Sequence, residues 1–174
     1  MSIAYLADHP EYLPIVAGWV YGYWGHLLPG VNLEMIERRF HTRLNRDALP
    51  LTVIALAEGQ PVGTASLALE DMSTRPDLSP WLASVYVVPA CRGRGIGSSL
   101  VQAAEEAARR LNIARLYLFT PDRQSFYARL GWAPLEWTEY RGESVVIMSK
   151  SFVAASVKLA EAEAHLTAAR DLGT

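Results

Sequence analysis

A cluster of three glycines and two arginines occupies residues 92–97, Arg-Gly-Arg-Gly-Ile-Gly, between an apolar run and an amphipathic run. Glycines leave backbone N–H groups open to close approach, and the positive end of a following helix dipole attracts an anion. The cluster therefore predicts a phosphate site. The alternative interpretation is a tight turn that binds nothing.

Two common phosphate-binding motifs do not fit this cluster. A P-loop needs Gly-x4-Gly-Lys-Ser/Thr, and no lysine follows these glycines. A dinucleotide fingerprint needs Gly-x-Gly-x-x-Gly, but Ser98 stands where its third glycine belongs, and no acidic residue follows about twenty positions later. The phosphate site must therefore be of another kind.

Composition indicates one folded domain. The 174 residues are 51% hydrophobic and carry a formal charge of −2, so no global basic field favours nucleic acid or anionic lipid. A lone cysteine, Cys91, excludes an internal disulfide, and the scattered histidines give no metal-ligand spacing, so no metal is expected. The N-terminus lacks a signal-peptide pattern and no apolar run is long enough for a membrane span, so we expect a cytoplasmic protein with no membrane partner.

The order of predicted elements describes the fold that must position the glycine cluster. Helical spacing, β-rich runs and turn residues predict strands at 3–7, 51–57, 61–69, 81–88, 114–119, 132–140 and 144–150, and helices at 10–23, from 33 to about 44, 98–111 and 121–130. This predicts an α/β (α+β) domain with a mixed, mostly antiparallel sheet.

Several end signals support these elements. Asn32 can cap the second helix, Asn112 can take the left-handed conformation that stops the third, and Thr120 followed by Pro121 is typical of a helix start. On the third helix the apolar spacing directs Glu105 and Glu106 outward. We expect residues 1–150 to form the domain and the alanine-rich residues 151–174 to add a C-terminal helix.

Residues 92–97 fit Arg/Gln-x-x-Gly-x-Gly/Ala, and at this point the chain resembles the GNAT superfamily of acyl-CoA-dependent N-acetyltransferases. A second stretch, residues 126–132, Phe-Tyr-Ala-Arg-Leu-Gly-Trp, is similar to the family's Phe-Tyr-x-x-x-Gly-Phe. The resemblance covers residues 3–150, includes the order of elements, and implies two splayed central strands that flank the pyrophosphate helix.

The resemblance implies a site for acetyl-CoA, with CoA as product and no metal. Backbone groups of one strand would pair with the pantetheine arm, a turn would hold the pyrophosphate, and Thr120 stands where many members have an asparagine. The implied coenzyme residues are Val85, Tyr86, Val87, Arg92, Gly93, Arg94, Gly95, Ile96, Gly97, Ser98, Thr120 and Tyr127.

The resemblance assigns Tyr127 as the general acid, against the alternative that it is a core aromatic residue. Many members place a glutamate on the strand before the glycine turn, but residues 81–88 contain no acid or histidine. Glu70 and Asp71, at the end of the preceding strand, are the nearest candidates for the base, with Ser84 as a holder of water. A solvated strand end is the alternative for both acids.

The implied reaction is direct transfer of acetyl from acetyl-CoA to a primary amine in a ternary complex, with the Val87 N–H polarising the thioester carbonyl. Three questions stay open. The acceptor is a small amine or a protein or peptide N-terminus; the chain is an enzyme or a non-catalytic acyl-CoA sensor; and it is a monomer or a homodimer. Aromatic residues in the first helix and last hairpin, and His26, are expected near the acceptor.

Overall fold

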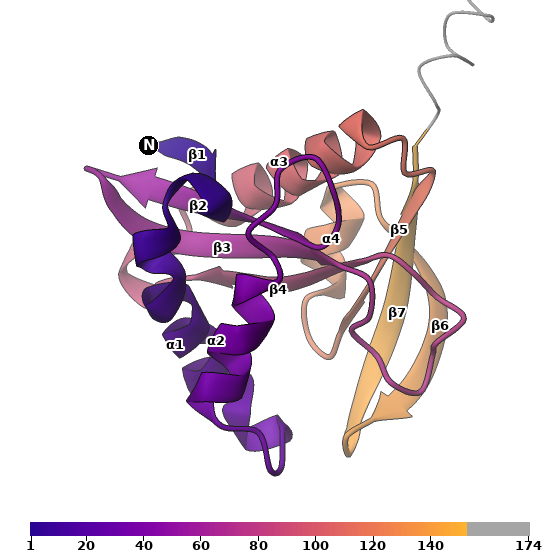
Figure 1. Ribbon diagram of the computed structural model, residues 1–174. Coiled ribbons are helices and arrows are strands. Elements are labelled where there is room, and N and C mark those ends of the chain that lie inside the picture. Colours follow the sequence, from indigo (N-terminus) through magenta and orange to yellow (C-terminus); the bar gives the residue numbers. More distant parts are fainter. Residues whose placement is uncertain (153–174) are drawn as a thin grey trace, which may run out of the picture.

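A seven-stranded sheet forms the centre of the computed structural model, which describes residues 1–152 (Figure 1). Its strand order is β1-β2-β3-β4-β5-β7-β6, and every neighbouring pair is antiparallel except β4 and β5. The strands are β1 Ser2–Tyr5, β2 Leu51–Ala57, β3 Gln60–Ala68, β4 Trp81–Val87, β5 Arg115–Thr120, β6 Ala133–Tyr140 and β7 Glu143–Ser151. The predicted mixed, mostly antiparallel α/β fold is confirmed.

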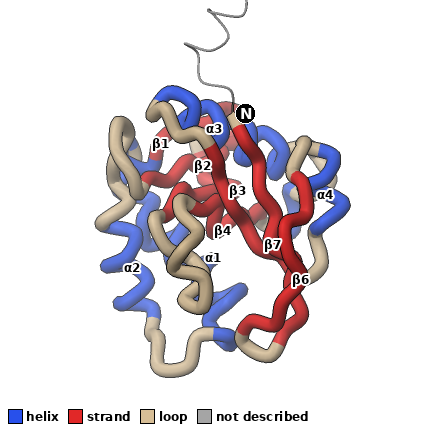
Figure 2. Tube along the Cα trace, turned by 90° about the vertical axis from the view of Figure 1, so that its right-hand side faces the viewer, coloured by secondary structure: helices blue, strands red, loops and turns tan. Residues whose placement is uncertain are grey.

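Helices cover both faces of this sheet, and Figure 2 shows α2 and α4 at opposite sides of the strands. The helices are α1 Leu13–Trp24, α2 Leu33–His41, α3 Ile96–Arg110 and α4 Gln124–Arg129. Side chains alternate along β2, so Val53 and Ala55 pack in the core with α3, whereas Ile54 packs in the core with α1 and α2. The predicted C-terminal helix falls almost entirely on residues 153–174, outside the described residues.

Local turn chemistry follows the sequence closely. The two-residue turns Glu58-Gly59 and Arg141-Gly142 have positive φ at both residues, as tight hairpins require. Asn32 caps α2, because its side-chain oxygen accepts from the Met35 N–H at 2.9 Å. The end of α2 differs from expectation: the helix stops at His41, and Leu44 packs from the loop that follows.

The end of α3 also forms as predicted. Asn112 has φ +56, and the Ile113 N–H donates to the Ala108 carbonyl at 3.0 Å, which closes the helix with a left-handed residue. Glu105 departs from its predicted outward orientation, since only 2% of the residue is exposed. It has buried partners from two other segments, which the helical period alone does not reveal.

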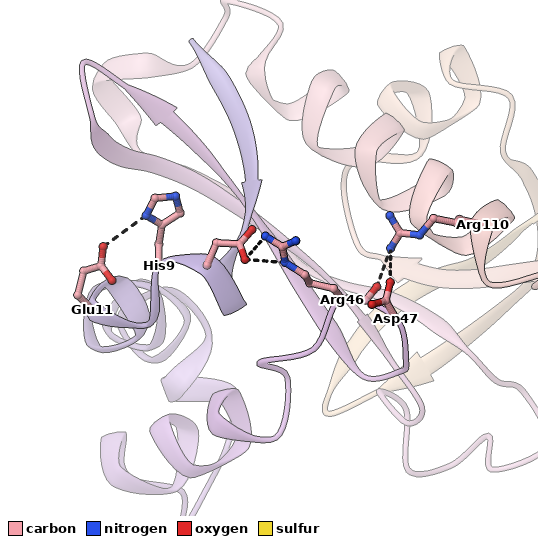
Figure 3. A network of polar contacts seen from close by, with 6 residues as sticks. His9, Glu11, Arg46, Asp47 and Arg110 are labelled. Atoms are coloured by element: carbon pink, nitrogen blue, oxygen red, sulfur yellow. Dashed lines mark hydrogen bonds and ion pairs between the residues drawn. The ribbon is translucent and has the colours of Figure 1, made fainter.

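A surface network holds the loop between α2 and β2 from two sides (Figure 3). Arg46 forms an ion pair with Asp8, next to β1. Arg110, in the last turn of α3, donates to the Arg46 carbonyl at 2.6 Å and lies 3.7 Å from Asp47. Exposed ion pairs add little stability, so their main effect is to fix where this loop runs.

The contact between β3, β4 and α3 depends on the absence of a side chain at Gly63. A Cβ there would lie 2.8 Å from the Tyr86 carbonyl oxygen and 2.9 Å from a Leu100 methyl group. We expect Gly63→Ala to lower the free energy of unfolding by roughly 1–3 kcal/mol, because β4 must shift. Denaturant titration measures this loss.

The matched control for this substitution is Gly18→Ala on α1, where a Cβ meets nothing within 4 Å. Alanine favours a helix interior over glycine, so the control should be neutral or stabilising. Equal unfolding midpoints for Gly63→Ala and the parent protein would contradict the close approach of β3 and β4.

Candidate active site

Strands β4 and β5 separate almost as soon as they meet. Their parallel pairing is limited to Trp81 opposite Tyr117, where the Tyr117 N–H donates to the Pro80 carbonyl at 3.1 Å. Beyond this point β4 pairs only with β3, and Figure 1 shows the two strands running apart. The splayed strands implied by the resemblance are therefore present, and β4 has an open backbone edge.

A bulge in β4 lies at this separation. The register with β3 shifts by one residue between Thr64 opposite Tyr86 and Ser66 opposite Ala83, and Ser84 takes φ +55. A bulge of this kind bends a strand and redirects its side chains. It carries Ser84 and Val85 to the wall of the cavity described below.

Beyond the bulge, backbone groups alternate between β3 and the open edge. The Val88 N–H donates to the Val62 carbonyl at 3.0 Å, so residues 86 and 88 face β3 and Val87 faces the open edge. The expectation of three backbone contacts from 85–87 therefore needs correction at Tyr86, whose N–H and C=O pair within the sheet. The Val87 carbonyl already accepts from Arg92 Nε at 2.9 Å, which leaves its N–H as the open donor.

The glycine turn exposes several further donors. Gly93 and Gly95 have φ +73 and +78, and a Cβ at either would meet nothing within 4 Å. The first hydrogen bond of α3 runs from the Ser99 N–H to the Gly95 carbonyl at 3.0 Å, so the N–H groups of residues 96–98 have no acceptor within the helix. The turn therefore combines free N–H groups, open space and a helix N-terminus, which suits a phosphate.

A single cavity of about 1410 Å³ joins the glycine turn to most of the predicted site. The predicted residues that line it are Glu70, Asp71, Val85, Tyr86, Val87, Arg92, Gly93, Gly95, Ile96, Gly97, Ser98, Thr120 and Tyr127. Arg94 is not among the lining residues. Cys91 and His26 also line this cavity.

Tyr127 reaches this cavity from α4. The residue is 9% exposed, and its ring packs edge-on against Phe126 and Trp132 at centroid distances of 4.9 and 6.3 Å. Its hydroxyl has no hydrogen-bond partner within residues 1–152. Burial raises the pKa of Tyr127 well above its ordinary value of 10, so the phenol carries its proton at neutral pH.

A buried carboxylate fixes the end of the helix that carries Tyr127. Glu105 accepts from Trp132 Nε1 at 2.9 Å and from Lys150 Nζ at 2.7 Å, and Lys150 also donates to the Leu130 carbonyl at 2.6 Å. This network joins α3, the end of α4 and β7. Because each member is hydrogen-bonded, the network holds Tyr127 and α3 in a fixed relation.

The start of α4 differs from the sequence prediction. The helix begins at Gln124, and Pro121 lies before it in a turn, not in the first helical position. The Thr120 hydroxyl accepts from the Arg123 N–H at 3.0 Å, so its oxygen already supports this turn. Thr120 nevertheless lines the cavity as expected.

The two candidate bases differ in their surroundings. Asp71 is half-buried and Glu70 is exposed, although both line the cavity. Burial raises the pKa of Asp71 from 3.8 to about 6, against the opposing positive charges of Arg43, Arg141 and Arg39. A carboxyl group with such a pKa can accept a proton near neutral pH, so Asp71 is the better candidate.

Arg43, which was not among the residues predicted from the sequence, is 4% exposed and lines the cavity. Its Nη1 donates to the Ser84 hydroxyl at 3.3 Å, and burial lowers its pKa from 12.5 to about 10. The helical spacing of residues 36, 40 and 43 could have indicated this position, because it puts Arg43 on the same face as the core residues Ile36 and Phe40. An arginine in a core-facing position suggests a ligand site.

Residues 1–152 lack the features of two other kinds of site. No three His, Cys, Asp or Glu side chains there gather closely enough to hold a metal ion. None of the helices in the same residues combines the length and apolarity that crossing a membrane requires.

Comparisons with solved structures find the same fold. Ribosomal-protein-alanine N-acetyltransferase from Brucella melitensis is 26% identical, with a TM-score of 0.65 over 87% of this chain and 100% of that one. An aminoglycoside 6'-N-acetyltransferase complexed with coenzyme A is 16% identical, with a TM-score of 0.68 over 88% and 98% of the two chains. Rv2747 from Mycobacterium tuberculosis, in a complex that includes CoA, is 20% identical, with a TM-score of 0.62 over 82% and 95%.

A match to a family model assigns the chain to a protein family, in agreement with these fold similarities. The model of the acetyltransferase (GNAT) family matches residues 19–132, which include the bulged strand, the glycine turn and Tyr127. The open edge of β4 and the N–H groups at the start of α3 lie within this matched range. The chain therefore belongs to the GNAT acetyltransferase family.

Proposed function

We propose that this protein transfers an acetyl group from acetyl-CoA to a primary amine by direct attack in a ternary complex. The observation that carries the proposal is the cavity that joins the N–H-lined glycine turn to Tyr127 and Asp71. The coenzyme complexes among proteins of the same fold support the choice of donor.

The residues of the turn suit the donor. The free N–H groups at the start of α3 and the open space beside Gly93 and Gly95 fit a pyrophosphate, and Arg92 adds positive charge. The open edge of β4 suits an extended amide chain, because such a chain can use backbone hydrogen bonds. Acetyl-CoA supplies an activated thioester.

The residues at the centre suit the proton transfers. Asp71 takes a proton from the acceptor ammonium, and the neutral amine forms the C–N bond while the C–S bond breaks. The Val87 N–H stabilises the charge that develops on the carbonyl oxygen, and Tyr127 donates its proton to the departing sulfur. One proton is released to solvent overall once Tyr127 is reprotonated and the new amide has lost its second proton.

Two alternatives remain testable against this proposal. A protein or peptide N-terminus as acceptor is favoured by the 26% identity to a ribosomal-protein-alanine N-acetyltransferase. A non-catalytic acyl-CoA sensor is the alternative of another class, and Asp71 in the cavity speaks against it because it supplies a base. A panel of amines and short peptides with acetyl-CoA, followed by CoA release, separates the three.

The first prediction concerns the glycine turn. Acetyl-CoA at about 100 times its dissociation constant should stabilise the parent protein by about 2.7 kcal/mol, seen as a higher Tm. Gly95→Val should lose this shift, because φ +78 strains a branched residue and its side chain enters the phosphate space. Gly59→Val is the control, with φ +76 and the same open surroundings in the remote β2–β3 turn, and should keep the shift. A folded Gly95→Val protein with the parent shift would exclude the pyrophosphate assignment.

The second prediction concerns the acid. Tyr127→Phe should keep the fold and the acetyl-CoA affinity but lower kcat by about 10²-fold, the low end for general acid catalysis, because a CoA thiolate is a good leaving group. Since burial raises the pKa of Tyr127, the difference should persist up to pH 10 and shrink only above it. Tyr117→Phe removes a hydroxyl outside the cavity lining and should behave as the parent. Parent rates in Tyr127→Phe, with chemistry rate-limiting, would make Tyr127 a packing residue.

The third prediction concerns the base. The kcat/KM for the acceptor should fall as pH drops through about 6, where Asp71 becomes protonated, and Asp71→Asn should remove this limb with a loss of about 10²-fold. Glu70→Gln should retain the fall of kcat/KM near pH 6. If this fall disappears in Glu70→Gln, Glu70 is the general base.

Asp71→Asn has a second readout in stability. The pKa of Asp71 is raised in the folded state, so its contribution to stability is full below its unfolded value of 3.8 and is lost as pH rises through about 6. Above pH 6 the variant should therefore have a higher Tm than the parent protein. A lower Tm at pH 8 would show that the ionised carboxylate stabilises the fold.

A further inference from the structure

Three arginines surround the part of the cavity where Asp71 lies. Arg39 belongs to α2, Arg43 follows that helix, and Arg141 lies in the turn between β6 and β7. Each is close enough for its charge to lower the pKa of Asp71 against the effect of burial. Figure 1 shows α2 and the β6–β7 turn at the same lower end of the molecule.

These arginines lack carboxylate partners in the described part of the chain. Glu70, Asp71 and Glu143 line the same cavity, but none of the ion pairs formed within residues 1–152 includes Arg39, Arg43 or Arg141. Other arginines of the protein, such as Arg75 and Arg46, do form such pairs. The cavity therefore holds guanidinium groups that can bind an anion.

Arg43 is the buried arginine of the three, and a buried charge is costly unless it is paired. Its guanidinium carbon lies 4.9 Å from the centre of the Phe40 ring, and one of its donors reaches Ser84. No buried polar side-chain atom in residues 1–152 is without a partner, so the remaining nitrogens of Arg43 must reach the cavity. An anion in the cavity would pair with this fork.

The coenzyme phosphates do not explain this site. Ser84, which Arg43 contacts, is three residues before Val87, whose carbonyl binds Arg92 at the glycine turn. At about 3.3 Å per residue of extended strand, Ser84 lies at most about 10 Å from Val87 along β4, since the bulge shortens the strand, so Arg43 and the glycine turn contact different parts of β4. The reacting carbonyl would lie between them, so Arg43 is on the acceptor side.

Another wall of the same cavity is aromatic. Tyr23 and Trp24 of α1 gather around Tyr86, with ring centroids 5.6 and 6.3 Å from it, and all three line the cavity. The Arg92 guanidinium lies 5.5 Å from the centre of the Tyr86 ring, so this wall extends toward the glycine turn. Aromatic rings bind apolar side chains and contact other rings favourably. The cavity thus combines a carboxylate, the Arg43 guanidinium without an ion-pair partner in residues 1–152, and an aromatic wall.

We propose that the acceptor is a free amino acid with an aromatic or large apolar side chain, whose carboxylate pairs with Arg43 while its amino group faces Asp71. This inference rests on the proposed acetyl transfer. A polyamine offers no anion to Arg43 and is repelled by the three arginines. A peptide N-terminus has an amide in place of the carboxylate.

The test compares three matched acceptors with the parent protein: phenylalanine, phenylalaninamide and 2-phenylethylamine. Release of CoA is measured at a fixed fraction of neutral amine. We expect kcat/KM to be roughly 10–100-fold higher for phenylalanine, the range for a hydrogen bond to a charged group. Equal values for the three, or higher values for a polyamine or a peptide, would overturn the inference and leave acetyl transfer standing.

Variants of Arg43 test whether this residue causes the preference for phenylalanine over the acceptors that lack a carboxylate. Arg43→Gln should raise KM for phenylalanine and abolish its preference over 2-phenylethylamine, measured as the ratio of the two kcat/KM values at pH 8, where a change in the pKa of Asp71 affects both acceptors alike. Arg43→Lys should recover part of this preference, since lysine keeps the charge but not the fork. Arg38→Gln is the control, because Arg38 is exposed on the same helix, pairs with Glu34 and lies outside the lining. An unchanged preference in folded Arg43→Gln would also overturn the inference.

Two measurements distinguish a misfolded variant, a failure of the proposed acetyl transfer and a failure of the proposed carboxylate selection. A Tm shift with acetyl-CoA shows that each variant is folded, and if Arg43→Gln does not fold, the exposed Arg39→Gln replaces it, with a smaller loss of preference expected. If the parent binds acetyl-CoA but acetylates no amine, the proposed transfer fails. Calorimetry of phenylalanine against the CoA complex, with phenylalaninamide as comparison, then still decides whether the cavity selects a carboxylate.

Discussion

The loss of pairing between β4 and β5 is the constraint on which the site depends. A sheet interior normally satisfies every backbone donor and acceptor, but β4 and β5 pair only where Trp81 lies opposite Tyr117. The bulge at Ser84 turns β4 away, while Val85 and Val87 still pack against the core under α3. The separation thus opens a cavity without dividing the core, and it leaves the Val87 N–H as a donor in the wall.

The contrast between Glu105 and Asp71 shows how burial has different consequences in one protein. Glu105 is enclosed by Trp132, Lys150 and Arg109, so its charge is satisfied within the fold. Arg43 is buried and Asp71 is half-buried, but the two form no direct ion pair, and burial shifts the pKa of both. A network in which every charged group has a partner stabilises the fold, whereas charged groups in a cavity that lack an ion-pair partner indicate a ligand site.

Turns and helix ends were predictable because their causes are local. The positive φ of Gly95, the cap at Asn32 and the stop at Asn112 each follow from one side chain and its nearest backbone. The start of α4 was not predictable in the same way, because Thr120 belongs to β5 and its pairing with β7 delays the helix to Gln124. A cap signal on its own does not say whether the strand before it has ended.

The sequence by itself determined the order of strands and helices and the glycine turn, since these depend on residue types at short spacing, while the resemblance of two motifs to one family implied a place for Tyr127 beside that turn. Only the tertiary structure decided that Asp71 is half-buried while Glu70 is exposed, that Tyr86 pairs with Thr64 in the sheet, and that Glu105 is buried. It also brought Arg43 against Ser84, a contact between residues 41 positions apart. Such contacts depend on how separate elements pack, and the periodicity of a single helix or strand carries no information about the segment across from it.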